Sequence, residues 1–188
     1  GFLKETIEII ERIDCAEIEN IAAALVRARN SGGRLFVIGS GGGAAHASHA
    51  VNDFRKIAGM EAYTPTDNVA ELTARINDDG WDTSYSNWLK GSHMRNRDVL
   101  MVLSVGGGDT DLNVSMNLVR CIQLAKKLGS TVCGVVGRDG GYTAKMADHC
   151  LVVPTVNRAH ITAHTESFQA VVWHLLVSHP TLQTTMPK

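Results

Sequence analysis

Apolar and polar positions along the chain follow two periods, and segments of the two kinds alternate. Short continuous apolar runs bounded by turn residues are typical of buried strands, and they occur at 34–39, 99–104, 131–136 and 150–153. Helical spacing of apolar residues predicts helices at about 44–58, from 67 or 68 to 76, and at about 83–93, 115–128, 142–147 and 162–178. This alternation predicts an α/β fold with an open parallel sheet.

The first thirty residues carry one more helical pattern. Apolar residues from Ile7 to Val26 form a stripe with charged residues between them, and Ser31-Gly32-Gly33 ends it. We expect a long N-terminal helix over about 3–30, followed by an α/β core over about 34–178. The length of 188 residues suits one hydrophobic core, so residues 1–188 are predicted to form a single domain.

Composition narrows the classes of function. The net charge of −1 gives no electrostatic sign of nucleic acid or a membrane surface as partner. No apolar run approaches the roughly 20 residues that span a bilayer. The cysteines are scattered without a CxxC pair and have apolar neighbours, which favours reduced core thiols and a cytoplasmic location; they are Cys15, Cys121, Cys133 and Cys150.

Glycine-rich turns follow three of the predicted strands, and because ligands of open parallel sheets bind beyond the carboxyl ends of the strands, we expect these turns to converge on one crevice. The first contains Ser40, Gly41, Gly42 and Gly43, and the second is Ser104-Val105-Gly106 with two further glycines. Such turns bring backbone N–H groups close to an anion, although a tight turn that binds nothing has the same pattern. Ser115 lies where the next helix begins, so it could cap that helix or contact a phosphate. No GxGxxG or GxxxxGK[ST] motif is present, and nucleotide binding therefore has little support.

Two pairs of acidic and histidine residues lie on predicted helices. His49 and Asp53 are four residues apart and share one helical face. Glu166 and His174 are eight apart, which is about 12 Å along a helix. Each pair alone could consist of surface or core residues with no functional role. Two nitrogens and two carboxylate oxygens together, however, would suit Zn²⁺ or a similar divalent ion. We interpret His46, His93, His160 and His164 as solvated or capping residues.

The order and spacing of several motifs resemble the SIS (sugar isomerase) domain family, and within it the bacterial phosphoheptose isomerases. The resemblance extends from about residue 5 to 178. Its pieces are the first glycine turn with Ala44-Ala45, the His49 and Asp53 pair, Leu72-Thr73-Ala74-Arg75-Ile76-Asn77-Asp78, Gly137-Arg138-Asp139-Gly140-Gly141, and Thr162, Glu166 and His174.

The resemblance implies a five-stranded parallel sheet between helices and a homotetramer with active sites at subunit interfaces. It implies conversion of sedoheptulose 7-phosphate to D-glycero-D-manno-heptose 7-phosphate by proton transfer between C1 and C2. Asp53 would be the base and His174 its acid/base partner. One Zn²⁺ per active site would be bound by His49, Asp53, Glu166 and His174. The substrate would be bound by Ser40, Gly41, Gly42, Gly43, Asn77, Asp78, Ser104, Val105, Gly106, Ser115 and Glu166.

The chain departs from the family pattern in four places. Asp53 occupies the position of a family Glu, Glu166 that of a Gln and Gly43 that of a Ser. Residues 109–114 look inserted after the second glycine turn. Two alternatives therefore stay open: isomerisation of another phosphosugar, and a non-catalytic SIS module that binds a phosphosugar or a protein partner.

Overall fold

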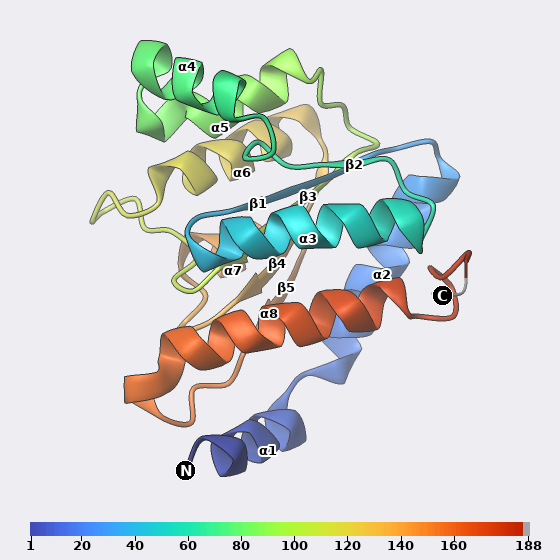
Figure 1. Ribbon diagram of the computed structural model, residues 1–188, viewed down its shortest axis with the longest axis vertical. Helices are drawn as coiled ribbons and strands as arrows, with labels where there is room; N and C mark the ends of the chain where they lie inside the picture. Colours follow the sequence, from blue (N-terminus) through green and yellow to red (C-terminus); the bar gives the residue numbers. More distant parts are fainter. Residues whose placement is uncertain (186–188) are drawn as a thin grey trace.

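The computed structural model describes residues 1–185. Its centre is a five-stranded parallel sheet with the strand order β2-β1-β3-β4-β5 (Figure 1). Leu35 pairs with Val99, and Val99 pairs with Thr131. The strands are β1 (Leu35–Gly39), β2 (Ala62–Tyr63), β3 (Val99–Ser104), β4 (Thr131–Val136) and β5 (His149–Val152). The predicted α/β fold and the five parallel strands implied by the resemblance are confirmed.

Helices cover both faces of the sheet, and alternate residues of the central strands explain why. Leu35 and Val37 of β1 pack into one core with α2, α3 and α8, while Phe36 and Ile38 pack into another with α5 and α6. The helices are α1 (Phe2–Arg12), α2 (Cys15–Asn30), α3 (Gly42–Lys56), α4 (Val69–Asp79), α5 (Trp81–Gly91), α6 (Met116–Leu128), α7 (Gly141–Met146) and α8 (Ile161–Val177), with a 3-10 turn, η1 (Arg158–His160), before α8.

The N-terminal segment is helical but does not form the single helix expected over 3–30. Ile13 is extended, with φ −66° and ψ 138°, and it separates α1 from α2. Asp14 then caps α2, because its side chain accepts a hydrogen bond from the Glu17 N–H at 3.1 Å. Because of this break, α1 does not continue along α2 but lies beside the start of α8 (Figure 1).

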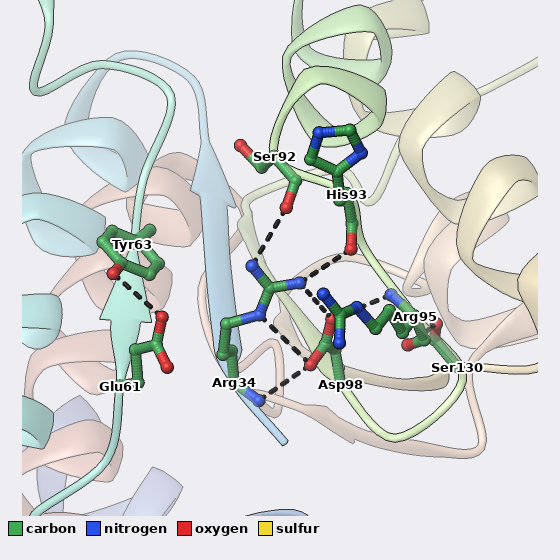
Figure 2. Close-up of polar contacts among 8 residues, drawn as sticks. All are labelled: Arg34, Glu61, Tyr63, Ser92, His93, Arg95, Asp98 and Ser130. Carbon is green, nitrogen blue, oxygen red and sulfur yellow. Dashed lines mark hydrogen bonds and ion pairs between the residues drawn. The ribbon is translucent and has the colours of Figure 1, made fainter. Parts of the chain in front are cut away.

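A polar network joins the amino ends of β1 and β3 (Figure 2). The buried Asp98 carboxylate accepts from the Arg34 N–H at 2.9 Å, from the Arg34 guanidinium at 2.8 Å and from the Arg95 N–H at 2.8 Å. The same guanidinium donates to the carbonyls of Ser92 and His93. This network holds the sheet at the end opposite the glycine turns, so its polar groups serve the fold.

The cysteines follow the prediction only in part. Cys121 and Cys133 are buried and Cys150 is half-buried, and burial raises the pKa of the Cys150 thiol to about 12. Cys15 is exposed at the start of α2, so the interpretation of that residue as a core thiol is wrong. Over residues 1–185, none of the helices has the length and apolar character needed to cross a membrane.

Candidate functional site

The predicted pair on α3 meets the predicted histidine on α8. The two helices pack side by side (Figure 1). Asp53 Oδ2 lies 3.7 Å from His49 Nε2 and 3.9 Å from His174 Nε2. One ligand atom from each of these residues lies within 4.8 Å of the other two. The side chains of His49 and His174 are 59% and 52% exposed and that of Asp53 is 13% exposed, so the group opens onto the molecular surface.

Hydrogen bonds around this triad of His49, Asp53 and His174 leave its inner atoms free. His174 Nδ1 lies 2.7 Å from the Ala170 carbonyl oxygen, which can only accept. Nδ1 therefore carries the proton, and in the neutral ring Nε2 keeps its lone pair. Asn52 Nδ2 donates to Asp53 Oδ1 at 2.8 Å and leaves Oδ2 for chemistry. The donor set of two imidazole nitrogens and one carboxylate oxygen suits Zn²⁺.

Glu166 is not part of this group. Its carboxyl lies against the start of α3, where a Cβ at Gly42 would come within 2.5 Å of Glu166 Cδ. The reason is the helical rise: α3 and α8 run in the same direction, and eight residues separate Glu166 from His174 by about 12 Å. The structure thus brings together three of the four predicted ligands and places the fourth at the first glycine turn.

Close packing explains why position 43 of the first glycine turn is a glycine. A Cβ on Gly43 would lie 2.3 Å from the Leu103 carbonyl oxygen, so a serine does not fit there without movement of the backbone. Ser40 Oγ accepts from Asn117 Nδ2 at 3.1 Å, and Tyr85 donates to the Gly39 carbonyl at 3.1 Å. Burial raises the pKa of Tyr85 to about 12, so the phenol stays neutral.

Asn117 is a residue that the sequence reasoning missed. It is fully buried in the first turn of α6, and its Oδ1 has no hydrogen-bond partner among residues 1–185. Its Nδ2 contacts the turn that was predicted to bind substrate. A polar amide between Met116 and Leu118, at the start of a buried helix, was the available signal.

The second glycine turn and the turn before α7 interlock. The Val105 carbonyl accepts from the Gly137 N–H at 3.0 Å, and the carbonyls of Gly107 and Gly108 accept from N–H groups in the first turn of α7 at 2.9 and 2.8 Å. Ser104 Oγ accepts from the Gly107 N–H at 3.0 Å. Ser115 has a left-handed backbone, with φ 53°, and makes no capping bond. The glycine turns do converge at the carboxyl ends of the strands, as predicted, but many of their polar groups bond each other.

The inserted segment forms a closed loop beside these turns. Asp109 and Val114 exchange two backbone hydrogen bonds, at 2.9 and 3.0 Å. The Asp109 carboxylate accepts from the N–H groups of Asp111 and Leu112 within the loop, so it turns inward to its own backbone. A cavity of about 430 Å³ lies beside the loop, and Arg138 and Lys145 are the basic residues in its lining.

Asn77 and Asp78 are not near the triad within one chain. They lie at the exposed end of α4, where Asn77 Nδ2 donates to Asp78 Oδ1 at 2.8 Å. The helix packs on α5, across the sheet from α8. Their predicted contact with substrate stays a prediction.

Comparisons with known proteins agree with this architecture. The family described as "SIS domain" matches residues 1–137. A probable phosphoheptose isomerase of Thermoplasma volcanium is 32% identical over 161 residues, which is 80% of this chain and 79% of that protein. A phosphoheptose isomerase of Rhodospirillum rubrum is 32% identical over 169 residues, covering 87% and 84% of the two chains.

Among solved structures, the phosphoheptose isomerase of Neisseria gonorrhoeae superposes with a TM-score of 0.81 at 26% identity, over 94% of this chain and 93% of that one. The similarity to these phosphoheptose isomerases, in sequence and in fold, thus extends over most of this chain. The chain belongs to the SIS domain family.

Proposed function

We propose that this protein is an aldose–ketose isomerase that interconverts sedoheptulose 7-phosphate and D-glycero-D-manno-heptose 7-phosphate, with residues 1–188 forming one SIS domain. Relatives named phosphoheptose isomerase align over four fifths of the chain. The observation that carries the proposal is the convergence of His49, Asp53 and His174, with His174 Nε2 3.9 Å from Asp53 Oδ2.

The chemistry requires one base and one proton carrier. Asp53 Oδ2 removes a proton from C1 of the ketose, which leaves an enediolate across C1 and C2. The same carboxyl returns the proton to C2, while His174 Nε2 moves the hydroxyl proton from O1 to O2. The carbonyl passes from C2 to C1, and no oxidant or reductant is consumed. Asp53 and His174 belong to a group that opens onto the molecular surface, where a sugar phosphate can reach them.

A divalent metal fits the same group. His49, Asp53 and His174 would hold Zn²⁺ or a similar ion. Glu166 is the fourth ligand that the resemblance implies, and its carboxyl lies at the first glycine turn. Zn²⁺ would polarise the sugar carbonyl as a Lewis acid. Asp53 Oδ2 faces both histidines, so its roles as ligand and as base compete for one oxygen. Asn52 holds the other oxygen in place.

Phosphate binding is assigned to the carboxyl ends of the strands. Ser40, Ser104 and Ser115 remain the predicted hydroxyl donors, together with the backbone of the first two glycine turns. Arg138 and Lys145 line the neighbouring cavity together with three aspartates, Asp109, Asp111 and Asp139, so its lining has no excess of positive charge. The loop at 109–114 lines the same cavity, and this departure from the family pattern favours a second candidate, an isomerase of another phosphosugar.

We further infer a homotetramer with active sites at subunit interfaces. The triad is exposed, and the exposed apolar residues Val171 and Leu175 lie on the same helix as His174. Helix α1 carries an exposed apolar stripe of Leu3, Ile7 and Ile10. A second copy seated on these faces would enclose the triad. The cytoplasmic location expected from the sequence stays a prediction.

The deciding experiment measures turnover of sedoheptulose 7-phosphate by the purified protein, with chelator and then with added Zn²⁺. Loss of turnover on chelation and its return with Zn²⁺ would support both the reaction and the metal. Turnover that chelator does not change would support the proposed reaction and contradict the proposed metal. Turnover of a different phosphosugar in a panel would favour the second candidate, and turnover of none would favour a binding module.

A further inference from the structure

A second group of metal-ligating side chains lies outside the site described above. Glu5 of α1 contacts His160 of η1 and His164 of α8, and one ligand atom of each lies within 4.8 Å of the other two. Glu5 Oε2 is 2.8 Å from His160 Nδ1 and 2.7 Å from His164 Nε2. Three donors from opposite ends of the chain therefore converge where α1 meets α8.

This group is partly enclosed. The His164 side chain is 3% exposed, and the ring of Phe2 stacks on it with a centroid distance of 4.0 Å. Glu5 and His160 are half-buried. His164 is thus a buried residue, and its interpretation as solvated or capping is wrong. The Phe2 ring covers His164, whereas the His160 side chain is 42% exposed.

The hydrogen bonds of the group conflict at one atom. Asn157 Oδ1 accepts from the Ala159 N–H at 3.0 Å, which fixes the orientation of the amide. Asn157 Nδ2 then faces Glu5 Oε1 at 2.9 Å and His160 Nδ1 at 3.2 Å. His160 Nδ1 needs a proton to donate to Glu5 and a lone pair to accept from Asn157, and it cannot have both. A cation between the nitrogen and the carboxylate would use the lone pairs of both.

We propose that Glu5, His160 and His164 form a second divalent metal site, of the class that binds Zn²⁺, which fastens α1 to the start of α8. Two imidazole nitrogens and one carboxylate oxygen are a known zinc donor set, with water in the remaining position. Asn157 orients the carboxylate from outside the ligand set. The site does not depend on the proposed function, because none of its residues belongs to the triad.

The protonation state of Glu5 agrees with a ligand role. The hydrogen bond that Asn157 donates is the largest of the contacts that lower the pKa of Glu5 below its ordinary value, and Asn157 is not among the proposed ligands. The carboxylate is therefore ionised at neutral pH, as metal binding requires. Metal entry also requires the three ligand atoms to separate, because ligands about 2.0–2.1 Å from a tetrahedral ion lie farther apart than a hydrogen-bonded pair.

The test uses the full chain with the triad removed. A His49→Ala/His174→Ala background is stripped with chelator, incubated with excess Zn²⁺ and dialysed into metal-free buffer, and bound zinc is measured by mass spectrometry. We expect about one zinc per chain in this background and close to none after adding Glu5→Gln or His160→Gln. Bound Co²⁺ should give visible absorption bands that the same substitutions remove.

The matched control is His179→Ala, because His179 Nε2 contacts only one carboxylate, that of Glu19, at 3.2 Å. It should leave the zinc content unchanged. Far-UV circular dichroism in chelator shows whether each variant is folded. His160→Gln is the safer of the two substitutions, because the His160 side chain is 42% exposed and that of Glu5 only 19%. Zinc-free protein in the background, or zinc content undiminished by His160→Gln in a folded variant, would overturn the proposal.

Discussion

Asp53 and His174 face each other across 3.9 Å, and substitution of either residue tests the proposed proton transfer. Asp53→Asn keeps the size of the side chain and an oxygen for the Asn52 hydrogen bond, but it removes the base. We expect kcat to fall by about 10²- to 10⁴-fold, the usual contribution of a positioned base. His174→Ala should reduce kcat over the same range. Steady-state kinetics with sedoheptulose 7-phosphate measures both.

The control for these substitutions is His93→Asn. His93 is an exposed residue with φ 52°, a conformation that asparagine tolerates, and its side chain lies at the end of α5 away from the triad. It should keep the activity of the unmodified chain. Unfolding temperatures should agree across the set. Full turnover by a folded Asp53→Asn variant would exclude Asp53 as the base.

Gly43 and Gly106 lie in neighbouring glycine turns but should respond differently to substitution. A Cβ on Gly43 meets the Leu103 carbonyl oxygen at 2.3 Å, and a Cβ on Gly106 meets only Arg138 Cδ, at 3.9 Å. Gly43→Ala should therefore destabilise the fold by about 1–3 kcal/mol through overpacking. Gly106→Ala creates no overlap and needs no positive φ, so it should change the free energy of unfolding by less than about 1 kcal/mol. Urea unfolding of the two variants compares them directly, and equal losses would contradict the packing explanation.

At the scale of whole elements, Asp98 joins two strands and the segment before them (Figure 2). Asp98→Ala leaves the largely buried Arg34 guanidinium without its carboxylate and frees two backbone N–H groups. We expect the free energy of unfolding to fall by about 3–5 kcal/mol. Chemical denaturation checks the value. Glu8→Ala breaks only the exposed pair with Arg12 and should cost less than about 1 kcal/mol.

Strand prediction succeeded because buried parallel strands are continuous apolar runs, and the strands at 99–104 and 131–136 were placed to the residue. The N-terminal helix was predicted too long because the apolar stripe continues past its break. Asp14 followed three residues later by Glu17 was a helix-start signal within that stripe. The interlocking of the later glycine turns depends on contacts between Gly107 and Gly140, which spacing along the chain does not encode.

The candidate site was predictable in pairs but not as a whole. The spacing of His49 and Asp53 places them on one helical face, whereas their contact with His174 requires α3 and α8 to pack side by side. The family resemblance supplied that expectation. The group of Glu5, His160 and His164 joins residues more than 150 positions apart, and no local pattern links such residues.

For the whole molecule, the separation between the triad and the glycine turns suggests that one copy does not complete the site. Gly42 and His49 are seven positions apart, which is about 10 Å along the helix. The triad is exposed, and apolar residues such as Val171 accompany it on the surface. Assembly would bury these residues and supply groups from a second copy, so activity should depend on assembly.

We therefore expect Ile7→Glu/Ile10→Glu to dissociate the proposed homotetramer and to lower turnover together with it. Both residues are exposed on α1, so charged side chains there should leave the fold of each chain intact and oppose only the apolar contact between copies. Light scattering on eluted protein gives the assembly state, and turnover at increasing protein concentration should recover as the copies reassociate. Val69→Glu, an equally exposed apolar position on α4, is the matched control and should change neither quantity. A monomeric double variant with undiminished turnover would show that one chain holds a complete active site.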